Sequence, residues 1–183
     1  MELIKQNTQS QIIKSLIVIF LGSIILAISA KVKIPFYPIP MTMQTFIVLF
    51  LGVSFGYKIA IATVSLYLLE GILGLPVFSN SPERGVGLVY FTGPTMGYLI
   101  GFLTAGYLAS KVNSKDGFLM VLVKLIVATS TIYIFGLLWL GTLIGWDKPI
   151  IALGAQPFLL AETFKVVLLA LITKQILKIR NII

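Results

Sequence analysis

Cysteine and histidine are both absent from this 183-residue sequence, and only 11% of its residues carry a charge. Without cysteine the chain has no disulfide and no thiol nucleophile, and without histidine it has no imidazole proton relay and no zinc site of the usual kind. The sequence also contains no G-x-x-x-x-G-K-[ST] phosphate-binding loop, which excludes ATP hydrolysis by that route. Much enzyme chemistry is therefore excluded, and no cofactor or metal is expected.

Hydrophobic residues make up 58% of the chain, and the mean hydropathy is +1.04. These values are typical of an all-α, polytopic membrane protein, and the length suits about six spans of roughly 20 residues. We therefore expect a single membrane domain over residues 1–183. The net charge of +8 comes from basic residues that flank apolar runs singly or in pairs, so it indicates membrane topology rather than nucleic-acid binding.

The apolar runs predict six transmembrane helices. A polar N-terminal tail, residues 1–11, precedes the first run, and a C-terminal tail, residues 178–183, follows the last. The prolines within residues 35–40 exclude a helix there, because proline removes an amide donor and favours extended backbone before it. The expected spans are residues 12–30, 42–55, 59–75, 93–109, 118–140 and 156–177, with the longest loop at residues 76–92.

Basic residues near the span ends are divided unequally between the two sides of the membrane. If successive loops lie on alternate sides of the membrane, one side has eight of these basic residues and both chain termini, and the other side has four. The positive-inside rule then places both termini in the cytoplasm. The larger group is Lys5, Lys14, Lys58, Lys111, Lys115, Lys174, Lys178 and Arg180, and the smaller group is Lys31, Lys33, Arg84 and Lys148.

Two charged residues, Glu162 and Lys165, interrupt the last apolar run. An ionised side chain at membrane depth costs about 2.5 to 3.5 kcal/mol, so it usually faces a partner, a cavity or a ligand. Three positions apart on a helix, the two side chains point roughly the same way. The predicted topology puts Glu162 about 8 Å below the outer end of its span. Either the two form an internal ion pair that joins helices, or they form a polar clamp in an outward-facing pocket.

Further polar residues are expected on the same outer side. Asn80 and Arg84 lie in the longest loop, and Gln44 lies at the start of the second span. A guanidinium matches a ligand carboxylate well, although Arg84 as a solvated loop charge needs no further explanation. Glu70, near the outer end of the third span, has Arg84 or Lys31 as candidate ion-pair partners.

One face of the first span carries only small side chains, those of Ser23, Ala27 and Ala30. Such faces allow helices to approach closely in a membrane. This face is therefore a candidate contact for a separate membrane subunit. Packing against another helix of the same chain is the alternative.

Several motifs resemble one known family. They are KIPF at 33–36 with PIPMTMQTF at 38–46, GILGLPVF at 71–78, GPTMGYLIGF at 93–102, and the acid-x-x-Lys spacing of Glu162 and Lys165. Together they resemble the BioY family, the biotin-specific substrate-binding (S) components of energy-coupling-factor (ECF) transporters. The resemblance covers about residues 23–174.

The resemblance implies a six-helix S component, multi-pass in the plasma membrane, that binds biotin near the outer surface and is not an enzyme. It implies a partnership with an ECF transmembrane coupling subunit and ABC-type ATPases, or action alone or as an oligomer. Residues that the resemblance and the topology assign to the substrate are Glu162, Lys165, Asn80, Arg84 and Gln44, and those assigned to the coupling subunit are Ser23, Ala27 and Ala30.

Three residues depart from the family pattern. Glu162 stands where the family more often has Asp, Met96 stands where Gly is usual, and Glu70 stands where an apolar residue is common. None of these departures removes the predicted site.

Other functions stay open from the residues alone. An S component for another vitamin, such as thiamine, fits the same features. An intramembrane enzyme would use Glu162 as a general acid or base, but Lys165 beside it favours the ionised carboxylate, which suits binding better than proton donation. A purely structural assembly subunit is a further alternative.

Overall fold

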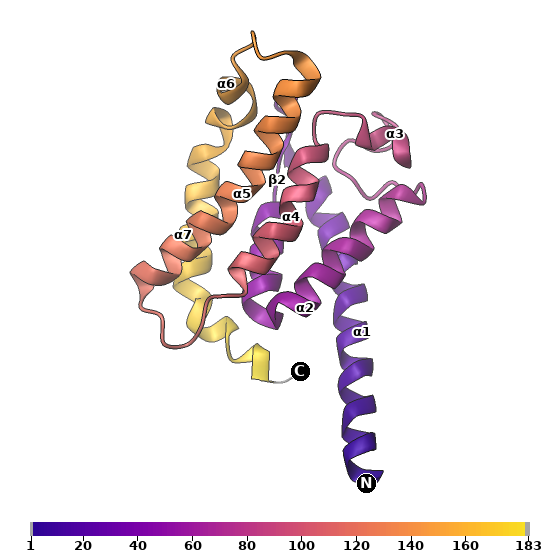
Figure 1. Cartoon of the computed structure of the whole chain (residues 1–183), viewed down its shortest axis with the longest axis vertical. Helices are drawn as coiled ribbons and strands as arrows, with labels where there is room; N and C mark the ends of the chain where they lie inside the picture. The colour runs from indigo at the N-terminus through magenta and orange to yellow at the C-terminus, as the bar shows by residue number, and fades with distance from the viewer. Residues whose placement is uncertain (1, 182–183) are drawn as a thin grey trace.

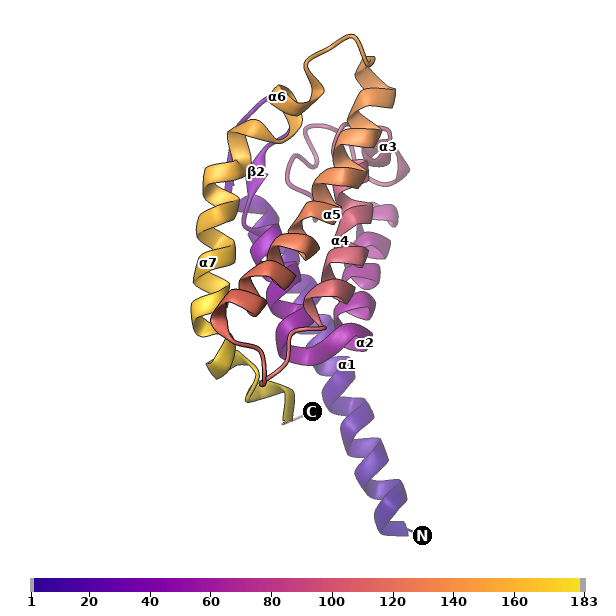
Figure 2. The same ribbon diagram turned by 60° about the vertical axis from the view of Figure 1, so that its left-hand side comes forward.

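Long apolar helices account for most of the chain in the computed structural model, which describes residues 2–181 and the side chains of residues 9–180. The helices pack side by side in a bundle, and both termini lie at the same end (Figure 1, Figure 2). The elements are α1 (Glu2–Lys31), β1 (Lys33–Ile34), β2 (Met41–Thr42), α2 (Gln44–Ile72), α3 (Leu88–Phe91), α4 (Met96–Ala109), α5 (Phe118–Ile144), α6 (Ile150–Gly154), η1 (Gln156–Phe158), α7 (Leu159–Ile176) and η2 (Ile179–Asn181).

Helix α2 consists of two arms that fold back on each other at Gly56. Gly56 has φ 79° and ψ 174°, a conformation that is not helical and that glycine adopts at little cost. The Gln44 side-chain amide donates a hydrogen bond to the Tyr67 hydroxyl at 2.8 Å. In a straight helix these residues would be about 34 Å apart, so the two arms must run in opposite directions. The predicted link between the second and third spans is confirmed.

Four segments of the described chain are long and apolar enough to cross a membrane: Gln9–Lys31, Gln44–Ile72, Phe118–Ile144 and Ile150–Ile176. Helix α4 is apolar but shorter. When the two arms of α2 are counted separately, the bundle contains six helical segments, as the apolar runs predict.

The connecting segments contain structure that differs from the prediction. Strands β1 and β2 pair in antiparallel register, Lys33 opposite Thr42 and Ile34 opposite Met41, so the fold is not purely helical. The prolines between the strands prevent a helix, and the extended backbone on either side of them can pair. Helix α1 begins at Glu2, inside the predicted polar tail, and α4 begins only after Pro94. Met1 and residues 182–183 of the predicted tails lie outside the described residues.

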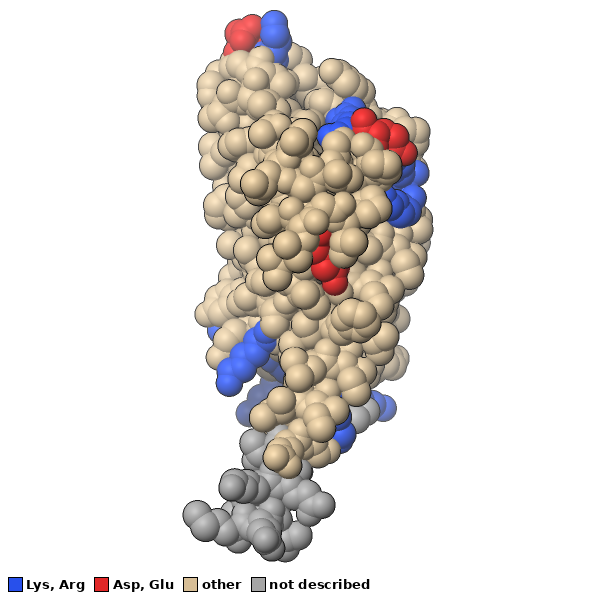
Figure 3. Space-filling model, turned by 90° about the vertical axis from the view of Figure 1, so that its right-hand side faces the viewer, with Lys and Arg blue, Asp and Glu red and all other residues tan. Residues whose placement is uncertain are grey.

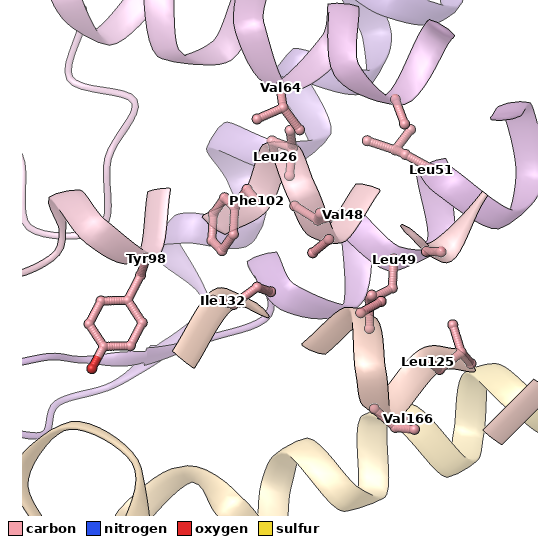
Figure 4. Close-up of a cluster of buried hydrophobic side chains, with 14 of the residues drawn as sticks. Leu26, Val48, Leu49, Leu51, Val64, Tyr98, Phe102, Leu125, Ile132 and Val166 are labelled. Carbon is pink, nitrogen blue, oxygen red and sulfur yellow. The ribbon is translucent and has the colours of Figure 1, made fainter. Parts of the chain in front are cut away.

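Glycine residues allow α2, α4 and α5 to pack closely. A Cβ atom on Gly101 would lie 2.6 Å from the Ile132 Cα, and a Cβ on Gly52 would lie 2.5 Å from the Gly106 carbonyl oxygen. Without a side chain at these positions the backbones can approach. Apolar side chains fill the centre of the bundle (Figure 4), among them Leu26, Val48, Leu49, Phe102, Leu125 and Ile132.

Candidate functional site

A cavity lies within the bundle, between the start of α2 and helices α3, α4, α5 and α7. The space within it that a water-sized group can occupy is about 50 Å³. Its walls come from segments far apart in the sequence, which the fold brings together. Most of the wall is apolar or aromatic, as is usual for small-molecule sites. The aromatic residues of the wall are Phe78, Tyr90, Tyr98, Phe102, Tyr133 and Phe158.

Glu162 is the acidic residue of this wall, and one of its carboxylate oxygens is unpaired. Oε1 accepts hydrogen bonds from the Thr45 hydroxyl at 2.9 Å and from the Lys165 Nζ at 2.8 Å. Oε2 is buried and has no hydrogen-bond partner among the described residues. A buried polar atom without a partner costs about 1 to 3 kcal/mol, and more when the group is charged. A ligand N–H or O–H that donates to Oε2 would remove this cost.

Glu162 also borders a second space. Together with Tyr133 it lines an apolar groove between α5 and α7 on the outside of the bundle. The carboxylate therefore stands in the wall that separates the cavity from this groove.

Lys165 lies behind Glu162 and is not part of the cavity wall. Its ammonium group donates to the Thr42 carbonyl at 2.6 Å, to the Thr45 hydroxyl at 3.0 Å and to Glu162 Oε1. An ammonium group has three donors, so all of them are used within the chain. The side chains of Lys165 and Glu162 are only 6% and 8% exposed. In this structure Lys165 positions the Glu162 carboxylate and balances its charge. This contact is the internal ion pair, one of the two arrangements that the sequence allowed.

Gln44 lines the cavity as well. Its Oε1 accepts from the Thr42 hydroxyl at 3.3 Å, and its amide donates to the Tyr67 hydroxyl. Tyr67 in turn donates to the Val77 carbonyl at 3.2 Å. This chain of hydrogen bonds ties the start of α2 to its second arm and to the loop that follows, so it fixes one wall of the cavity.

Asn80 and Arg84 are not in the cavity wall. Lys33 Nζ donates to the Asn80 side-chain oxygen at 2.8 Å and to the Ser79 carbonyl at 2.7 Å. Arg84 Nη1 donates to the Pro38 carbonyl at 2.7 Å. These contacts join residues 32–43 to residues 73–95, and we call the two segments together the lid. Asn80 and Arg84 therefore hold the lid together rather than face the cavity.

The cations of the lid bind only neutral oxygen atoms. Lys31, the last residue of α1, binds the lid in the same manner as Lys33 and Arg84: its Nζ donates to the Phe78 carbonyl at 2.7 Å and to the Ser81 carbonyl at 2.8 Å. Within the described part of the chain, none of these three cations forms an ion pair. The lid also contains Glu83, whose negative charge acts on Lys31, so the positive charge close to the cavity is partly balanced.

Several residues of the site were missed by the sequence analysis. Thr42 and Thr45 bind the Glu162–Lys165 pair, although they lie more than a hundred positions before it in the chain. Both threonines belong to the PIPMTMQTF motif, from which only Gln44 was selected. The aromatic wall had no local signal, because aromatic residues are common in every membrane helix.

The predicted partner surface on α1 requires a correction. Ser23 and Ala30 are 0% exposed, because this side of α1 packs within the chain. The Ser23 hydroxyl lies 2.8 Å from Glu70 Oε1 on the second arm of α2. Packing within the chain, the alternative interpretation, therefore applies to these two residues, and Ala27 is half-buried. Glu70 contacts Ser23 rather than the basic residues with which it was expected to pair.

Comparisons with known proteins agree with this architecture. The sequence profile of the BioY family matches residues 4–181. The probable biotin transporter BioY of Pyrococcus horikoshii is 30% identical over 162 residues, which cover 88% of this chain and 94% of that protein. The biotin transporter BioY of Thermotoga maritima is 31% identical over 156 residues, which cover 85% of this chain and 90% of the relative.

A solved structure shares the fold. The crystal structure at 2.1 Å of the S-component for biotin from an ECF-type ABC transporter matches with a TM-score of 0.76 and 21% identity, covering 92% of this chain and 93% of the other. These relatives are transport proteins rather than enzymes, and with the apolar helices they indicate a multi-pass protein of the plasma membrane. By its sequence profile and its relatives, the chain belongs to the BioY family.

Proposed function

We propose that this protein binds biotin in the cavity beneath the lid and mediates its uptake as the S component of an ECF transporter. The observation that carries the proposal is the unpaired, buried Oε2 of Glu162 in an aromatic-walled cavity. Biotin has a ureido ring with two N–H donors, an apolar thioether bicycle and a carboxylate on an aliphatic chain. A carboxylate oxygen facing aromatic walls suits the ureido end of such a molecule.

The remaining groups of the site suit the other parts of biotin. The bicycle would lie between aromatic side chains such as Tyr98 and Phe158. The ligand carboxylate would point toward the lid, where Lys33 and Arg84 donate to neutral oxygens in the structure. A carboxylate is a stronger acceptor for these cations than a carbonyl. In this arrangement Asn80 and Arg84 act through the lid, and Lys165 acts by holding Glu162.

The same proposal includes six membrane crossings, with both termini in the cytoplasm and the lid outside. The lid lies at the end of the bundle away from the two termini (Figure 1). The larger group of basic residues is on the side of the termini, as the positive-inside rule requires. Because the sequence has no phosphate-binding loop, energy for uptake would come from a partner ATPase module acting through a coupling subunit.

Ligand-dependent stability tests the binding part of the proposal. Biotin at 100 times its Kd would stabilise the folded protein by about 2.7 kcal/mol, which raises the melting temperature of the purified chain. Thiamine and other vitamins, added in the same assay, should neither stabilise the protein nor compete with biotin. A melting temperature that biotin leaves unchanged, in protein that contains no copurified biotin, would overturn the proposal.

Uptake tests the transport part. Cells that express this chain with coupling subunits should accumulate radiolabelled biotin faster than cells that lack the chain. Expression of the chain without the coupling subunits separates a transporter that acts alone from one that depends on an ATPase module. If biotin binds the purified chain but uptake is unaffected in both cases, the protein is a binding protein only.

A further inference from the structure

Glu70 is an acidic residue that the proposed biotin site does not use. It lies on the second arm of α2, is half-buried, and has Oε1 2.8 Å from the Ser23 hydroxyl of α1. Ser23 precedes Lys31, the end of the span Gln9–Lys31, by eight positions, or about 12 Å along the helix. Through Ser23, the Glu70 carboxylate therefore contacts α1 about 12 Å below the end of that span, although the helix of Glu70 itself ends two residues later at Ile72.

The contacts of Glu70 within the chain do not balance a negative charge. The Ser23 hydroxyl has one proton, yet its oxygen lies 2.9 Å from the Phe20 carbonyl as well as 2.8 Å from Glu70 Oε1. No lysine or arginine whose side chain is described forms an ion pair with Glu70. An acid at this depth is costly when ionised without a partner, and it is costly to keep neutral at physiological pH. A cationic or hydrogen-bond donor group from outside the chain would therefore stabilise the Glu70 carboxylate at this position.

The surface around Glu70 is apolar. Leu73, which directly follows the last residue of this arm, is 74% exposed, and Phe20 on the neighbouring α1 is 57% exposed. Figure 3 shows one face of the molecule on which most charged atoms gather toward two ends, with acidic atoms interrupting the wide uncharged band between them. An isolated acid in an otherwise uncharged band is a specific feature that a complementary charge can recognise.

We propose that Glu70 docks a transmembrane helix of a separate subunit, and that this helix carries a lysine or arginine at the depth of the Glu70 carboxylate. The ion pair would balance the carboxylate, and the apolar remainder of the helix would cover Leu73 and Phe20. Charge complementarity also fixes the depth and rotation at which the two helices meet. The inference rests on the proposed function, because the coupling subunit is the membrane partner which that function requires.

Assembly of the complex tests this inference. The full chain is co-expressed with the coupling subunit and the ATPases, and the amount of this chain that copurifies with the coupling subunit is measured. Glu70→Gln should lower that amount at least tenfold and Glu70→Lys should abolish it, while biotin binding by the isolated chain stays unchanged. Asp147→Asn removes an exposed acid elsewhere and should leave assembly as it is. An acidic substitution of the matching basic residue in the partner should restore assembly with Glu70→Lys.

A spectroscopic measurement separates docking from a general effect on folding. Because the sequence has no cysteine, Glu70→Cys accepts a single spin label without background. The label should be accessible to oxygen dissolved in the lipid when the chain is alone, and should become protected when the coupling subunit binds. Equal assembly of Glu70→Gln and the unmodified chain, with no protection of the label, would overturn the inference. Self-association that depends on Glu70 without any coupling subunit would also overturn it. If the unmodified chain does not bind biotin, that result refutes the proposed function instead.

Discussion

Replacement of Glu162 with glutamine tests the candidate site directly. The variant keeps the size of the side chain and an oxygen that can accept from Lys165 and Thr45, but it removes the charge and one acceptor. A hydrogen bond to a charged group contributes about 1.5 to 3 kcal/mol. Since each 1.4 kcal/mol is about tenfold in Kd, biotin should bind Glu162→Gln roughly 10- to 150-fold more weakly than the unmodified protein.

Isothermal titration of the detergent-purified protein with biotin measures this difference. Glu162→Asp keeps a carboxylate on a shorter side chain and should bind biotin more tightly than Glu162→Gln. Asp147→Asn, which removes an acid outside the cavity, should bind as the unmodified protein does. If Glu162→Gln retains the full affinity while the protein stays folded, then Oε2 does not accept a ligand hydrogen bond and the reasoning is refuted.

Three further substitutions test the surroundings of the site. Lys165→Met should lower the free energy of unfolding by about 3 to 5 kcal/mol in denaturant unfolding, because it leaves the buried Glu162 carboxylate unpaired. The double variant with Glu162→Gln should recover part of the lost free energy of unfolding. Lys33→Gln removes a charged donor of the lid, so biotin should dissociate several times faster in stopped-flow measurements, and an unchanged rate would contradict the role of the lid. Gly101→Leu should prevent stable folding, because its Cβ would lie 2.6 Å from the α5 backbone, whereas Gly117→Ala, which has open space, should melt as the unmodified protein does.

The positions of the helices could be predicted because the signals for them are local. Hydrophobic runs of sufficient length, separated by glycine, proline and charge, determine where the backbone must satisfy its own hydrogen bonds in lipid. Gly56 illustrates this, since one residue with a positive φ is enough to reverse the direction of α2. The short strands were missed because two-residue pairing depends on how the proline-rich segment folds back on itself.

The candidate site could be predicted only in part, because its contacts connect distant segments. The depth and side of Glu162 stay predictions from its span, whereas the use of all three Lys165 donors within the chain depends on Thr42 and Thr45 at the other end of the sequence. The buried position of Ser23 likewise depends on α2 packing against α1. Spacing along one helix shows which residues share a face, but not which neighbour covers it.

The ion pair between Glu162 and Lys165 has a consequence for the response of the protein to voltage. Moving one elementary charge across the membrane potential involves about 2.3 kcal/mol per 100 mV. The two opposite charges lie 2.8 Å apart on one helix, so they move together and the potential exerts almost no net force on them. A lone carboxylate in the same place would make any movement of this site across the membrane depend on the potential. With the pair, the site itself contributes almost no net charge to such a movement.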